Sequence, residues 1–159
     1  MKIPLIDPER CDGCMSCVMA CAVGHGERGS ETYARIRIRR FMEEPKYVPV
    51  VCMACDEAPC IDVCPMNARF RHEAGGWVDT DPERCIGCRA CLYICPAAAP
   101  TIHPETGKSM SCDRCRNDPI GPWCEQACTL KGAIRFVDPH QIHRGSHDHP
   151  DCRKWHCRK

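Results

Sequence analysis

Residues 85–96 read Cys85-Ile-Gly-Cys88-Arg-Ala-Cys91-Leu-Tyr-Ile-Cys95-Pro96, so four cysteines follow one another at spacings of two, two and three residues. Three thiolates in so tight a loop can cap three irons of one cubane, while the fourth begins a segment that leads toward a neighbouring cluster. Thiolate sets also suit zinc. Zinc sites, however, usually pair two Cys-x-x-Cys knuckles across a longer loop, where a third nearby cysteine has no role. The spacing therefore favours a 4Fe–4S cluster over zinc ribbons.

The same pattern recurs along the chain. The sequence DPERC at residues 7–11 returns at residues 81–85, and the offset of 74 residues holds for all four cysteines of both groups. Two further groups also open with Cys-x-x-Cys and close with Cys-x-x-x-Cys, but their middle gaps are four and eight residues. In chain order the groups are Cys11, Cys14, Cys17 and Cys21; Cys52, Cys55, Cys60 and Cys64; Cys85, Cys88, Cys91 and Cys95; and Cys112, Cys115, Cys124 and Cys128. The chain reads as a duplicated two-cluster unit that binds four 4Fe–4S clusters through sixteen cysteines.

Composition supports a fold held together by metal. The chain has 159 residues and 18 cysteines; 43% of residues are hydrophobic, about a quarter of them cysteine, and only 6% are aromatic. The ordinary apolar core is therefore thin, and metal or disulfides must supplement it. The first ten residues lack the apolar run of a secretory signal, and the longest apolar runs reach about half the length of a membrane helix. We therefore expect a cytoplasmic protein with reduced thiols and no direct membrane insertion.

Charge and motifs narrow the function further. The formal net charge is +1, and four oxidised clusters at about −2 each would bring it to about −7, which argues against nucleic acid as a partner. We find no nucleophile–base pair, phosphate loop or pterin-binding stretch, so we assign no catalytic residues and expect no enzymatic activity in the chain itself.

With these motifs in hand, residues from about 5 to 137 resemble the four-cluster ferredoxin subunits of the dimethyl-sulfoxide-reductase type. The most specific pieces are residues 85–96, followed by Ala99-Pro100 and His103–Gly107, and the segment Pro49–Pro65. The resemblance implies an α+β fold of two ferredoxin-like modules, with small antiparallel two-stranded sheets and short helices around four clusters. It also implies a compact branch similar to subunits of formate dehydrogenases, carbon monoxide-linked hydrogenases and tungsten aldehyde oxidoreductases.

The resemblance further implies that groups exchange their last cysteines. The implied ligand sets are Cys11, Cys14, Cys17 and Cys128; Cys112, Cys115, Cys124 and Cys21; Cys52, Cys55, Cys60 and Cys95; and Cys85, Cys88, Cys91 and Cys64. Pro65 and Pro96 follow the last cysteines of groups two and three, which fits the pairing of these two groups. The duplication alone equally allows group one to pair with two, and three with four.

The function that follows is electron transfer. The resemblance implies a subunit that relays single electrons between a molybdenum- or tungsten-pterin catalytic subunit and a second partner, such as a flavoprotein, a hydrogenase or a soluble ferredoxin. The alternatives are a free-standing, diffusible polyferredoxin and a hydrogenase-linked electron carrier. A zinc-ribbon binding module and a redox sensor are further rivals from other classes.

Three local features carry additional expectations. Residues 1–137 form the four-cluster domain, and residues 138–159 form a polar tail whose Cys152 and Cys157 fit no cluster motif and are not assigned. That tail is either a docking arm or a small zinc site built from His147, His149, Cys152 and Cys157. The alternation over residues 33–41 predicts a half-buried strand with Ile36 and Ile38 on one face and arginines on the solvated face. Trp77, Trp123 and Tyr93 are expected to pack in the core rather than relay electrons.

Overall fold

The fold is described from a computed structural model, in which residues 2–73, 76–128 and 132–138 are described. The predicted tail lies outside the described residues apart from Asp138, and so do Cys152, Cys157 and the histidines proposed to accompany them. Within the described ranges, no helix combines the length and apolar character needed to cross a membrane.

Each cysteine group contains one short α-helix, and the third cysteine of the group is the second residue of that helix. The helices are α1 (Ser16–Gly24), α2 (Pro59–Asp62), α3 (Ala90–Ile94) and α4 (Trp123–Ala127). A residue in the left-handed region precedes α1, α2 and α3 directly: Met15, Ala58 and Arg89, with φ of 63°, 40° and 66°. This conformation reverses the chain sharply, so that α1 and α3 start two residues after the second cysteine of their groups and α2 starts four residues after it. Two 3₁₀ turns, η1 (Pro8–Arg10) and η2 (Glu31–Tyr33), complete the helical elements of the described residues.

The strands of the described residues form four antiparallel two-stranded sheets. The pairs are β1 (Ile3–Ile6) with β8 (Ile134–Val137), β2 (Arg37–Phe41) with β3 (Lys46–Val50), β4 (Arg69–Arg71) with β5 (Val78–Thr80), and β6 (Thr101–Ile102) with β7 (Ser109–Met110). In the first pair Ile3 lies opposite Val137 and Ile6 opposite Ile134, so the first and last strands of the described residues pair with each other. The predicted small sheets and short helices are confirmed, whereas the internal duplication stays a prediction.

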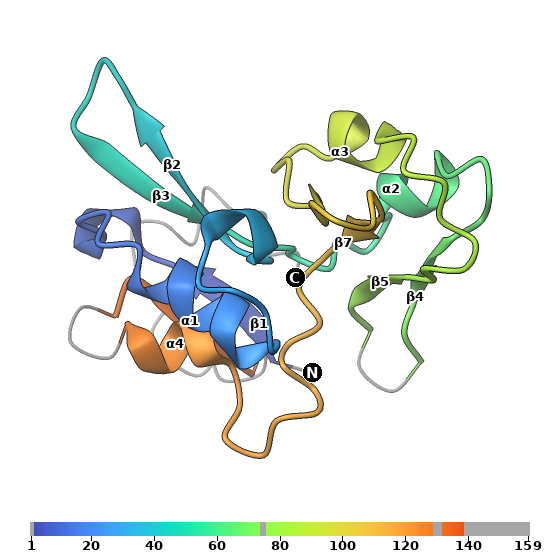
Figure 1. Cartoon of the computed structure of the whole chain (residues 1–159). Helices are drawn as coiled ribbons and strands as arrows, with labels where there is room; N and C mark the ends of the chain where they lie inside the picture. The colour runs from blue at the N-terminus through green and yellow to red at the C-terminus, as the bar shows by residue number, and fades with distance from the viewer. Residues whose placement is uncertain (1, 74–75, 129–131, 139–159) are drawn as a thin grey trace.

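The elements gather in two lobes (Figure 1). In the α1–α4 lobe, α1 packs against α4, and α4 against β8 of the β1–β8 sheet, while the β2–β3 hairpin extends outward beside η1. In the α2–α3 lobe, α2 packs against α3 and β4, and β5 contacts β7. The α2–α3 lobe is formed by the middle of the described chain, and the α1–α4 lobe is formed by the segments that precede and follow it. Groups one and four therefore share one lobe, and groups two and three share the other.

Cysteine is a large part of the buried core. Of the 23 apolar residues that are buried among those described, eight are cysteines, and the largest fully buried side chains besides Pro100 are Ile36, Ile134, Val18 and Val78. A core in which a third of the apolar residues are thiols has few ordinary aliphatic contacts. This matches the expectation that metal supplies much of the folding free energy.

The structure corrects two local predictions. The strand predicted for residues 33–41 begins only at Arg37, because η2 and an extended link occupy residues 31–36, although Ile36 is buried as expected. Arg35 is not on a solvated face but forms an ion pair with Asp113. Trp77 is buried as predicted, whereas Tyr93 is 85% exposed and does not pack in the core.

Candidate metal centres

All sixteen cysteines of the four groups are free thiols. Their exposure follows their position in the group. The third cysteine of every group is buried: Cys17, Cys60, Cys91 and Cys124. The second is the most accessible: Cys14, Cys55 and Cys88 are exposed, and Cys115 is half-buried. The first three thiol sets therefore extend from the core to the surface, whereas the fourth reaches only half-buried positions.

The residue before the second cysteine has a positive φ in every group. These residues are Gly13 (76°), Ala54 (54°), Gly87 (70°) and Arg114 (63°). The left-handed residue curls the Cys-x-x-Cys loop around the space that its two thiols face. Ala54 and Arg114 show that glycine is not required for the bend itself.

Packing explains the two glycines. A Cβ on Gly87 would lie 2.4 Å from the carbonyl oxygen of Gly107, and a Cβ on Gly13 would lie 2.6 Å from the Tyr47 ring. In both cases the neighbouring atoms belong to the protein chain itself.

Thiols of groups one and four lie close enough to influence one another. Burial, and then the neighbouring thiolates of Cys128 and Cys11, together raise the pKa of Cys17 to about 12. Burial also raises the pKa of Cys11. The backbone amide of Gly13 lowers this pKa in part, and the thiolate of Cys128 raises it. In group four, burial raises the pKa of Cys124 far above its ordinary value, with contributions from Cys112 and then Cys21. The last cysteines of the two groups thus each lie beside the other group's thiols.

Groups two and three show the same neighbourhood. A cavity is lined by Cys85, Cys88 and Cys91 of group three together with Cys64, the last cysteine of group two. Burial raises the pKa of Cys55, and the thiolates of Cys52 and Cys95 raise it further, so the last cysteine of group three lies beside group two.

Hydrogen-bond donors point at several of these sulfurs. Backbone amides donate to Cys21 Sγ from Arg35 (3.3 Å), to Cys64 Sγ from Ala68 (3.3 Å), to Cys95 Sγ from Ala99 (3.4 Å) and to Cys85 Sγ from Ser109 (3.4 Å). Amide donors stabilise a thiolate more than a thiol. Although burial would raise it, the amides of Ala68, Met66 and Arg69 hold the pKa of Cys64 below its ordinary value.

The donor set fits 4Fe–4S clusters. Four sets of soft thiol ligands, with amides aimed at their sulfurs, are the environment in which such clusters are held. An unpartnered cation supports the fit: all three guanidinium nitrogens of Arg114 are buried without a hydrogen-bond partner among the described residues. Arg114 stacks over Phe136, with its Cζ 5.2 Å from the ring centroid. Burial raises the pKa of Cys112 to about 12, and the charge of Arg114 partly opposes this rise. A buried cation of this kind calls for an anionic group beside Cys112.

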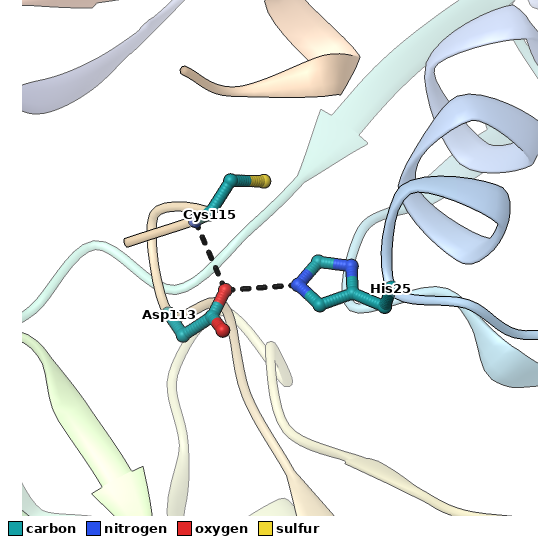
Figure 2. Close-up of side chains that lie close together, drawn as sticks. All are labelled: His25, Asp113 and Cys115. Atoms are coloured by element: carbon teal, nitrogen blue, oxygen red, sulfur yellow. Dashed lines mark hydrogen bonds and ion pairs between the residues drawn. The ribbon is translucent and has the colours of Figure 1, made fainter. Parts of the chain in front are cut away.

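A charged network next to group four escaped the sequence analysis. Asp113 accepts hydrogen bonds from His25 Nε2 (3.0 Å) and the Cys115 amide (3.0 Å), and its other oxygen pairs with Arg35 Nη1 (2.6 Å). Figure 2 shows His25, from the end of α1, facing Asp113 in the group-four loop. His25 Nδ1 lies 2.7 Å from the carbonyl oxygen of Cys21, so the network joins groups one and four. In the sequence, the position of Asp113 between two ligand cysteines could have indicated a special role. Its partners could not be recognised, because they are distant in sequence.

Electrostatics show what this network does. The hydrogen bond with Asp113, helped by Cys21, raises the pKa of His25 to about 10. Although burial would raise it, His25 and Arg35 hold the pKa of Asp113 far below its ordinary range. His25, Asp113 and Cys115 lie within 4.8 Å of one another, close enough to hold a metal ion. The Arg35 cation already neutralises the carboxylate, so the arrangement is a structural ion-pair network rather than a separate metal site.

A second buried charge was also missed. Arg69, the first residue of β4, is only 3% exposed and donates to Cys60 Sγ (3.4 Å). It lines the cavity formed by Cys64 and the group-three cysteines. The sequence places Arg69 five residues after Cys64 without indicating that its side chain turns inward.

The fold and the thiol sets define an iron–sulfur protein of the electron-transfer class. The 4Fe–4S dicluster domain family matches residues 44–138, and a 4Fe–4S binding domain family matches residues 3–26. The chain therefore belongs to the 4Fe–4S dicluster domain family, and it binds 4Fe–4S clusters.

Similar proteins cover most of the chain. Protein NrfC of Escherichia coli strain K12 is 36% identical over 141 residues, which are 82% of this chain and 62% of NrfC. The thiosulfate reductase electron transfer subunit PhsB of Salmonella typhi is 32% identical over 154 residues, covering 89% of this chain and 79% of PhsB. The polyferredoxin-like subunit of the aliphatic sulfonate oxidoreductase of Pyrococcus furiosus is 37% identical over 136 residues, covering 84% and 76%. The chain thus spans less than two thirds of NrfC but most of the other two.

A solved structure shares the fold. The active-site complex BamBC of benzoyl coenzyme A reductase with 1,5-dienoyl-CoA contains a chain that is 23% identical, with a TM-score of 0.50, over 86% of this chain and 75% of that one. At this identity the likeness concerns the arrangement of the backbone alone.

Proposed function

We propose that this chain is the electron-transfer subunit of an oxidoreductase complex and relays single electrons between a molybdenum- or tungsten-pterin catalytic subunit and a second redox protein. The observation that carries the proposal is the presence of four thiol sets, three of which reach the surface at an exposed cysteine. The names of the relatives support it, because they include the electron transfer subunit of a thiosulfate reductase and the polyferredoxin-like subunit of an aliphatic sulfonate oxidoreductase. When bound, 4Fe–4S clusters accept and release one electron at a time.

We further propose the exchanged ligand sets, each with three cysteines from one group and the last cysteine of another. The support is the proximity of Cys128 to group one, Cys21 to group four, Cys95 to group two and Cys64 to group three. The protein's part is to hold these thiols, donate amide hydrogen bonds to their sulfurs and exclude water from the buried third cysteine of each set. These contacts set the potential at each centre without any bond chemistry in this subunit.

Elemental analysis tests the subunit role. The protein is purified anaerobically from its own host, at moderate salt, and iron, molybdenum, tungsten and zinc are measured in the same chromatographic peak. We expect about sixteen irons per chain, with molybdenum or tungsten co-eluting. The same iron in a peak of the isolated chain, whose mass is 17.9 kDa, would instead establish the free polyferredoxin. Zinc in place of iron would exclude the iron–sulfur assignment.

Single alanine variants test the ligand sets. Cys128→Ala and Cys11→Ala should alter the same electron paramagnetic resonance (EPR) signal, and combining them should add nothing further. Cys21→Ala should alter a different signal, shared with Cys112→Ala. If Cys21→Ala and Cys11→Ala instead alter one signal, the exchange between groups one and four is wrong.

The cytoplasm is the compartment we propose for the mature chain. Sixteen free thiols in close sets would oxidise to disulfides in an oxidising compartment before clusters were inserted. Cell fractionation with immunodetection of the native chain checks this location. Recovery in the periplasmic fraction would show that the chain is exported.

A further inference from the structure

The guanidinium of Arg69 is enclosed in the α2–α3 lobe. Its Nη1 donates to the hydroxyls of Thr80 (2.9 Å), Ser109 (3.3 Å) and Ser111 (2.8 Å), and its Nη2 to Cys60 Sγ (3.4 Å). Thr80 lies directly opposite Arg69 in the β4–β5 register. Because these partners sit on three segments, the planar head of the side chain is fixed in position.

Among the described residues, the charge of Arg69 has no carboxylate partner. None of the ion pairs found among the described residues involves it, and its Nε is buried without a hydrogen-bond partner there. Hydroxyl groups solvate a cation in part but do not neutralise it. A buried charge is costly unless an opposite charge lies nearby. The site therefore requires anionic groups next to the guanidinium.

The thiols of groups two and three are the groups in reach. Arg69 donates to Cys60 of group two and lines the cavity of Cys64, Cys85, Cys88 and Cys91. Burial raises the pKa of Cys91, and the Ser109 hydroxyl and the charge of Arg69 both oppose that rise. Ser109 contacts two thiols of group three as well as Arg69. Its amide donates to Cys85 Sγ, and its hydroxyl lies 3.3 Å from Cys91 Sγ.

We propose that Arg69 is a positioning residue shared by the two ligand sets of the α2–α3 lobe, where its fixed positive charge raises the reduction potential of both. This rests on the proposed function and its ligand sets. One-electron reduction, with the electron supplied by a redox partner, adds one negative charge to a set, and a permanent cation beside it stabilises that charge. A guanidinium keeps its charge at all physiological pH values, so the effect does not depend on a proton.

Redox titration monitored by EPR tests this on the full chain, purified with its partners. Arg69→Gln removes the charge, Arg69→Lys keeps it, and Arg40→Gln removes a charge from the exposed part of β2 as a control. We expect Arg69→Gln to lower the one-electron reduction equilibrium constant of the two α2–α3 centres at least about tenfold, which is about 59 mV. Arg69→Lys should stay within about threefold of wild type, and Arg40→Gln should leave all centres unchanged. Wild-type potentials in Arg69→Gln, or equal shifts in Arg40→Gln, would overturn the proposal.

Two further measurements separate the possible failures. Iron content and the visible spectrum are recorded first, because absent clusters would refute the proposed function, whereas normal clusters with unchanged potentials would refute only the role of Arg69. If Arg69→Gln does not retain clusters, the chain is labelled with guanidino-¹⁵N arginine in the Arg114→Lys background, which removes the guanidinium that is buried without any hydrogen-bond partner among the described residues. Pulsed EPR should then detect ¹⁵N coupling at the reduced α2–α3 centres, and its absence would contradict the proposal.

Discussion

The indole ring of Trp123 in α4 occupies the place where a side chain on Gly24 of α1 would begin. A Cβ on Gly24 would lie 2.3 Å from Cδ1 and 2.5 Å from Cγ of this ring. The indole is itself fixed, because its Nε1 donates to Asp118 Oδ2 at 2.8 Å. The absence of a side chain at residue 24 is therefore what allows α1 and α4 to approach and bring groups one and four together.

Gly24→Ala should consequently destabilise the α1–α4 lobe. Overpacking of this kind costs about 1–3 kcal/mol, and we expect a lower denaturant midpoint and faster loss of visible absorbance in anaerobic unfolding. Gly29→Ala is the matched control, since a Cβ there would meet only Val23 at an ordinary 3.7 Å. Equal midpoints for the two variants would show that the approach at Gly24 is not needed.

Gly87→Ala should be more damaging than Gly107→Ala. Both glycines have positive φ, 70° and 67°, so both variants incur the left-handed strain of about 1–2 kcal/mol. Only the Cβ at residue 87 collides with a backbone atom, whereas at residue 107 it meets nothing within 4 Å. The comparison isolates the collision, and iron content together with thermal midpoints measures it. A Gly107→Ala variant as unstable as Gly87→Ala would contradict this explanation.

Asp113→Asn should destabilise the protein by about 1–3 kcal/mol. The amide keeps the shape of the side chain but no longer neutralises Arg35 and His25. The side chain of Asp113 is only 11% exposed, so water cannot replace the lost charge there. Glu9→Gln is the control, because Glu9 pairs with Lys46 at the surface and is 79% exposed. Ion pairs at the surface contribute little to stability because water screens them, so this variant should unfold near the wild-type midpoint. A loss in Glu9→Gln as large as in Asp113→Asn would refute the structural role of the network.

Removal of the clusters should unfold most of the chain. About a third of the buried apolar residues in the described part of the chain are cysteines, and without metal their thiols provide few dispersion contacts and no cross-links. Anaerobic chelation followed by far-ultraviolet circular dichroism should show loss of the secondary structure, and reconstitution with iron and sulfide should restore it. Native-like dichroism after complete iron removal would mean that the small sheets fold by themselves.

The cysteine spacing alone indicated the class of cofactor and the four ligand groups, because the geometry of a cluster restricts the intervals between neighbouring ligands. The small sheets and short helices were expected only from the resemblance to four-cluster ferredoxin subunits. The sequence also carried the repeated DPERC segments, although the structure leaves duplication as a prediction. Local spacing cannot reveal contacts between distant segments. Only the tertiary structure placed Cys64 in the cavity of group three, turned Arg69 inward among hydroxyls from β5 and the β7 segment, and joined His25 to Asp113, 88 residues away. These contacts depend on which helices pack together. The packing of α1 against α4 requires that residue 24 have no side chain, and this requirement can be recognised only once Trp123 is seen to lie against Gly24.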